Sequence, residues 1–82
     1  MLRIIFTKNT LIRDVAIASL NLSKNPRQVS VDFQIYQKAD WILIYSLQYD
    51  IDTILPIILE NWDPDRVYLP YLGRSVDMMH EI

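Results

Sequence analysis

The sequence predicts one small α+β domain whose elements follow the order strand, helix, strand, strand, helix, strand. Two stretches with apolar residues at helical spacing, near residues 10–22 and 51–62, alternate with four stretches of strand character. The chain has 82 residues, enough for a single domain with a thin core. With 51% hydrophobic and 22% charged residues, its composition is that of a globular protein.

The first strand is predicted over residues 2–7 and the first helix from residue 9 or 10 to residue 22. Residues 2–7 alternate with the period of a strand, and Asn9 or Thr10 can cap the helix with a side-chain oxygen. Four residues at helical spacing are expected to form the buried face of this helix: Leu11, Val15, Ala18 and Leu22. Three more are expected to broaden that face: Ile12, Ala16 and Leu20.

Residues 29–36 and 41–45 predict a hairpin with a short turn at 37–40. The first segment alternates strictly between apolar and polar residues, so we expect one continuous strand with a single buried face. That face is predicted to carry Val29, Val31, Phe33 and Ile35. The second segment is apolar on both faces, which predicts a strand in the middle of the sheet.

A second helix is predicted over residues 51–62. Asp50 or Asp52 can cap it, and both carboxylates favour the positive N-terminal end of a helix. Pro56 is expected near the first turn, where a missing N–H costs least. A last strand is predicted over residues 66–69.

This order of elements is the βαββαβ arrangement of ferredoxin-like folds. It predicts an antiparallel sheet with two helices on one face, forming a single domain over residues 1–82. Fold does not determine function, so the site is argued separately.

The sequence offers little support for catalysis or for metal binding. It contains no cysteine, which excludes disulfides, thiolate metal sites and a cysteine nucleophile. Two pairs of acids stand at a helix start and a turn, where capping and turn formation account for them: Asp50 with Asp52, and Asp63 with Asp65. His80, Asp77 and Glu81 stand at a chain terminus, which is poor preorganisation for a metal. We therefore expect no enzyme, catalytic residue, metal, cofactor or small-molecule substrate.

The net charge of −2 is unevenly distributed, with +3 on residues 1–41 and −5 on residues 42–82. A free-standing nucleic-acid binder is usually basic, so this balance argues against autonomous binding to DNA or RNA. The acidic half could face a basic partner or could simply solvate loops and helix ends. No signal peptide is visible, and the longest near-apolar run, residues 41–47, is too short to span a bilayer, so a cytoplasmic location without membrane binding is expected.

Residues 68–75 form the sharpest local feature, because they place the only glycine, Gly73, beside a proline, two tyrosines and an arginine. We expect a tight loop from Pro70 to Ser75 that displays Tyr71 and Arg74. Tyr and Arg are the residue types that dominate binding hot spots. The alternative interpretation is a loop that closes the last helix onto the sheet.

The same residues resemble a motif of a known family. Pro-Tyr-Leu-Gly-Arg-Ser at 70–75 is similar to the motif near the end of the ferredoxin-like part of the fifth Cas family. In type I CRISPR effector complexes, that subunit holds the 5′ end of the guide RNA and contacts the large subunit. The similarity covers about residues 29–75, family members are longer than this chain, and residues 1–28 depart from their usual N-terminal segment.

The resemblance implies a protein-interaction module that copies part of an effector subunit. Such a protein would compete for the effector complex or enter it, and so act as an anti-CRISPR of a phage, prophage or plasmid. The implied partner is the large or the backbone subunit, and the implied partner-binding residues are Pro70, Tyr71, Leu72, Gly73, Arg74 and Ser75. The alternatives are a small guide-RNA-binding subunit, in which Tyr36, Trp41 and Tyr45 could stack on bases, and an unrelated ferredoxin-like domain.

Overall fold

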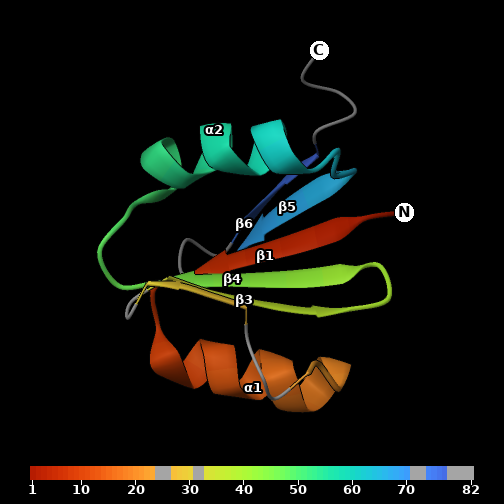
Figure 1. The fold of residues 1–82 in the computed structure, drawn as a ribbon. Helices are drawn as coiled ribbons and strands as arrows, with labels where there is room; N and C mark the ends of the chain where they lie inside the picture. The colour runs from red at the N-terminus through yellow and green to blue at the C-terminus, as the bar shows by residue number, and fades with distance from the viewer. Residues whose placement is uncertain (24–26, 31–32, 71–73, 78–82) are drawn as a thin grey trace.

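The computed structural model describes residues 1–23, 27–30, 33–70 and 74–77, the second and fourth of these ranges as backbone only. The described residues form one mixed β-sheet with a helix on each face (Figure 1). In chain order the elements are β1 (Arg3–Thr7), α1 (Thr10–Leu20), β2 (Arg27–Ser30), β3 (Phe33–Lys38), β4 (Trp41–Ser46), α2 (Ile51–Asn61), β5 (Arg66–Leu69) and β6 (Arg74–Asp77).

The strands lie in the order β2-β3-β4-β1-β5-β6, with β1 near the middle. β1 pairs in parallel with β4 on one side and with β5 on the other. The remaining neighbours, β2 with β3, β3 with β4 and β5 with β6, pair antiparallel. The predicted ferredoxin-like βαββαβ fold with a wholly antiparallel sheet is therefore wrong.

The two helices lie on opposite faces of the sheet and not on one face as predicted (Figure 1). α1 connects β1 to the edge strand β2, which runs parallel to β1 on the far side of β4 and β3. α2 connects β4 to β5 in the opposite direction across the sheet, past β1. Parallel crossovers are right-handed almost without exception. Two crossovers of one hand that move in opposite directions place their helices on opposite faces.

Each face of the sheet therefore has its own apolar layer. Under α2 the fully buried side chains come from three strands and the helix: Ile4, Phe6, Ile42, Ile44, Ile54, Ile58, Val67 and Leu69. Under α1 the buried cluster is smaller: Ile5, Leu22, Tyr36 and Leu43. β4 is buried on both faces, which confirms the prediction that residues 41–45 form a strand in the middle of the sheet.

The strand predicted over residues 29–36 is two strands. β2 and β3 pair antiparallel with each other, with Ser30 opposite Phe33; residues 31 and 32 lie outside the described residues. Phe33 and Ile35 are buried as predicted, but alternation assigns faces and does not reveal where a chain reverses. The predicted hairpin with residues 41–45 is confirmed between β3 and β4, with its turn at Ala39 and Asp40.

Helix α1 packs only part of the face that its spacing predicts. Leu11 is 69% exposed and Val15 is 55% exposed, and Ala18 is exposed as well; of the predicted face only Leu22, just beyond the helix, is buried. The three residues predicted to broaden that face, Ile12, Ala16 and Leu20, are half-buried, and Ala16 and Leu20 pack with Ile17 against the buried cluster of the sheet. α1 has two apolar stripes, and spacing within a helix does not say which one meets the sheet.

Helix α2 begins at Ile51, after Asp50, one of the two candidate cap residues, and its packing side is fixed by the buried residues Ile54 and Ile58. Pro56 lies in the second turn and not near the first, so the carbonyl of Asp52 lacks its helical donor. Both residues are exposed, which leaves that carbonyl accessible to water. The helix tolerates the proline because the lost bond lies on its solvent side.

The packing of α2 can be tested with two neighbouring residues. Ile58→Ala should lower the free energy of unfolding by about 2–5 kcal/mol, because it removes a fully buried side chain from the core. Leu59→Ala changes a side chain that is 48% exposed and should cost less than about 0.5 kcal/mol. Urea denaturation measures both values; equal losses would contradict this orientation of the helix.

Candidate interaction surfaces

Both helices begin just after the carboxyl ends of two neighbouring parallel strands. β1 leads into α1 on one face of the sheet and β4 leads into α2 on the other. This is a topological switch point, where open α/β sheets commonly bind ligands. The side chains at this point therefore decide whether a conventional ligand site is present.

Two buried hydroxyls at the switch point are engaged in shaping the backbone. Thr7 Oγ1 accepts a hydrogen bond from the amide of Asn9 at 3.1 Å. Ser46 Oγ accepts from the amides of Gln48 and Tyr49, at 3.3 and 3.2 Å. Thr7 and Ser46 are both fully buried, so these bonds satisfy groups that would otherwise be costly to bury.

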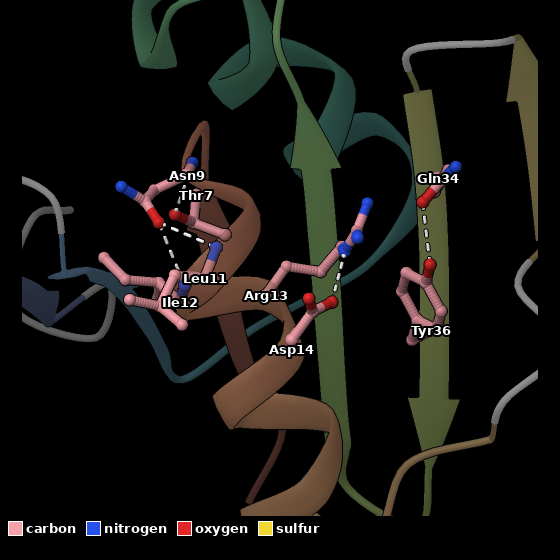
Figure 2. A network of polar contacts seen from close by, with 8 residues as sticks. All are labelled: Thr7, Asn9, Leu11, Ile12, Arg13, Asp14, Gln34 and Tyr36. Atoms are coloured by element: carbon pink, nitrogen blue, oxygen red, sulfur yellow. Dashed lines mark hydrogen bonds and ion pairs between the residues drawn. The ribbon is translucent and has the colours of Figure 1, made fainter.

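The remaining polar groups at the switch point cap and join the helices. Asn9 Oδ1 accepts from the amides of Leu11 and Ile12 at 2.9 and 3.0 Å, so Asn9, one of the two predicted candidates, caps α1 (Figure 2). Asp50 stands at the cap position of α2, yet its side chain makes no capping bond and instead pairs with Lys8. The switch point is thus held by structural contacts between the two helix starts.

The described residues hold no cluster of three or more metal-binding side chains of the His, Cys, Asp or Glu type. Asp65 is structural: its Oδ2 accepts from the amide of Leu2 at 2.7 Å, and its own amide donates to the carbonyl of Leu2 at 2.9 Å. His80 and Glu81 lie outside the described residues.

Two of the three strand aromatics considered for base stacking are buried under α1. Tyr36 is 6% exposed and Tyr45 is 3% exposed. Tyr36 Oη donates to Gln34 Oε1 at 2.7 Å (Figure 2), and the guanidinium of Arg13 lies 4.7 Å from the centre of the Tyr45 ring. Neither ring face is open to a nucleobase.

Arg13 is oriented by its neighbour in the sequence. Its Nε donates to Asp14 Oδ1 at 2.9 Å (Figure 2). Desolvation lowers the pKa of Arg13, but the hydrogen bond and charge of Asp14, together with Tyr36 and Tyr45, raise it, so that its pKa lies above the ordinary value. The guanidinium therefore remains charged and is neutralised within the chain.

The third strand aromatic, Trp41, belongs to a cation–aromatic group that the sequence analysis missed. The Arg3 guanidinium lies 4.1 Å from the centre of the Trp41 ring, and its Nη2 donates to Asp40 Oδ2 at 3.1 Å. Trp41 also lies against Tyr68, with ring centres 5.8 Å apart. The group assembles because Arg3 pairs with Trp41 across parallel strands, a register that local sequence does not reveal.

The predicted partner-binding segment, residues 70–75, is divided by the fold. Pro70 is exposed and follows β5 directly, and residues 71–73 lie outside the described residues. Arg74 and Ser75 belong to β6, opposite Leu69 and Tyr68 of β5, so the prediction that they form part of a loop is wrong. Among the described residues, β6 is the last strand on its side of the sheet.

A second candidate surface is the outward side of α1. We name it the α1 outer stripe and define it as Leu11, Val15 and Ala18, which are all exposed. The other large exposed apolar side chains of the described residues belong to other elements: Met1, Leu47, Tyr49, Ile57 and Leu59. The outer stripe gathers exposed apolar residues at successive turns of one helix, which distinguishes it from singly scattered ones.

Comparison with protein-family models, with curated proteins and with solved structures finds no match for this chain. Neither helix among the described residues has the length and apolar character needed to cross a membrane.

The different roles of the two cap residues can be tested by substitution. Asn9→Ala should lower the free energy of unfolding by about 1 kcal/mol, because two amides of α1 lose their acceptor. Asp50→Ala removes only the ion pair with Lys8, because Asp50 makes no capping bond. The Asp50 side chain is 71% exposed, so this substitution should lower the free energy of unfolding by a smaller amount. Chemical denaturation compares the two; a larger loss for Asp50→Ala would contradict these assignments.

Proposed function

We propose that the chain is a non-catalytic protein-interaction module that binds its partner at the sheet edge formed by β6. The observation that carries the proposal is the position of Arg74 and Ser75, from the predicted partner-binding segment, in the last strand of the sheet. The proposal places the protein in the cytoplasm.

An edge strand offers the chemistry that such binding needs. Every second backbone group of an edge strand points away from its neighbour and can pair with a strand of another protein. In this mode of recognition, backbone hydrogen bonds supply affinity and side chains on alternate positions supply specificity. β6 is four residues long and pairs with β5 along its whole length, so its backbone is already ordered for pairing.

The partner that we propose is a subunit of a type I CRISPR effector complex, the large or the backbone subunit. This part of the proposal is supported by the resemblance of residues 70–75 to the fifth Cas family. It draws no support from a shared fold, because the sheet order differs from the ferredoxin-like arrangement that the resemblance implies. A protein that occupies the docking place of a genuine subunit would act as an anti-CRISPR.

RNA binding is the weaker alternative on the geometry of the described residues. Tyr36 and Tyr45 are buried, and one face of Trp41 is covered by Arg3. Arg3 and Arg13 are each paired with an aspartate, which reduces the charge available to phosphates.

Co-purification tests the proposal. The tagged chain, expressed with the subunits and guide RNA of a type I effector complex, should co-elute with the large or backbone subunit during size exclusion. Replacing Tyr71, Leu72 and Arg74 together with alanine should abolish co-elution, because it removes the proposed anchors. Leu59→Ala on α2 is the control and should co-elute like the parent chain. Separate elution of the parent chain from every subunit would reject the CRISPR partner.

Proline substitutions test the strand-addition mode. Neighbouring residues of a strand direct their amides to opposite sides. One of Ser75→Pro and Val76→Pro therefore removes an amide that points away from β5 (the outward substitution), and the other removes an amide that points towards β5. The outward substitution should reduce partner binding at least tenfold and leave the thermal midpoint close to that of the parent. Unchanged binding by both folded variants would contradict pairing at this edge.

A further inference from the structure

The register between β5 and β6 assigns each position of β6 to one face of the sheet. Directly opposite residues of an antiparallel pair share a face. Val67 and Leu69 of β5 are fully buried in the layer under α2. Val76 stands opposite Val67, and Arg74 stands opposite Leu69, so both belong to the α2 side of the sheet.

The other two positions of β6 belong to the α1 side. Tyr68 packs against the buried cluster under α1, and Arg66, two residues before it in β5, shares that side. Ser75 stands opposite Tyr68 and Asp77 stands opposite Arg66. The register thus sets an acid across from a base, which is a favourable cross-strand combination.

Arg74 is the position of β6 that its neighbour β5 does not match in character. It stands opposite Leu69, whose side chain is 1% exposed, so β5 places no charged residue across from it. A basic residue on an edge strand hinders pairing with strands that bring an apolar or basic residue beside it. The same residue favours a strand that brings an acid there, so it makes the edge selective.

We propose that β6 accepts an extended partner segment with an acidic residue directly opposite Arg74 and a β-branched apolar residue directly opposite Val76. The two partner residues are two positions apart and share the α2 side, where the second one extends the apolar layer that Val67 begins. This pairing rests on the proposed function, because it describes the segment that would add to the same edge.

The direction of the added segment sets the order of its two recognition residues. Antiparallel pairing is slightly more stable per residue than parallel pairing, so the segment runs antiparallel to β6. It therefore passes Asp77 first and Arg74 last. The segment then reads Val or Ile, any residue, Asp or Glu, from its amino to its carboxyl end.

Titration of the full ¹⁵N-labelled chain with synthetic peptides, followed by NMR, tests this recognition. One peptide has the core Thr-Val-Thr-Glu and the other has Thr-Val-Thr-Lys, so they differ only at the position opposite Arg74. The parent chain should bind the Glu peptide about tenfold more tightly, because an opposite charge is replaced by a like charge. The shifts should centre on the amides of β6. The reversed core, Glu-Thr-Val-Thr, should bind more weakly than Thr-Val-Thr-Glu.

Variants of the chain separate recognition by Arg74 from the general effect of charge. Arg74→Glu should reverse the preference between the two peptides, and Arg74→Gln should abolish it. Lys38→Glu makes the same change of charge as Arg74→Glu at an exposed position of β3, and should keep the preference of the parent chain. The thermal midpoint identifies the variants that remain folded.

The possible failures of this inference and of the proposed function have different signatures. Equal binding of the Glu and Lys peptides at β6 would overturn the inference and leave the proposed edge site intact, as would a preference that Arg74→Gln does not change. Tighter binding of the reversed core would overturn it too. If none of the peptides shifts the amides of β6 at about 5 mM, the edge site itself is rejected.

Discussion

The arrangement of this chain depends on one constraint, the parallel pairing of β1 with both β4 and β5. A strand with two parallel neighbours requires two crossovers, and since these are right-handed and run in opposite directions, they bring a helix to each face. β1 must then be apolar on both faces. Ile4 and Phe6 face α2, while Ile5 faces α1, and all three are buried.

The same constraint determines where binding surfaces can form. The switch point between β1 and β4 is where this class of sheet commonly holds a ligand, but there Asn9 caps α1 and Lys8 pairs with Asp50. Outer surfaces of the described residues remain for recognition, among them the sheet edge at β6 and the outer stripe of α1, the helix with the smaller buried cluster beneath it.

Local features of the fold were predictable from the sequence, whereas its non-local features were not. The central place of residues 41–45 follows from side-chain chemistry and spacing, and each helix start follows to within a choice of two cap residues. The order of the strands depends on pairings such as Arg3 with Trp41, which are far apart in the chain. The side of α1 that packs against the sheet depends on that strand order too. The sequence alone therefore does not show which of the two apolar stripes of α1 is buried. Arg74 and Ser75, from the predicted binding segment, lie in an edge strand that no local sequence pattern predicted.

The most direct test of this account is the direction of the strands beside β1, measured by NMR through nuclear Overhauser contacts. The account predicts amide-to-Hα contacts that match Ile5 with Leu43 on one side and with Tyr68 on the other, in parallel register. Strong Hα-to-Hα contacts between β1 and either neighbour are the mark of antiparallel pairing. Their presence would contradict the central position of β1 and, with it, the placement of the two helices on opposite faces.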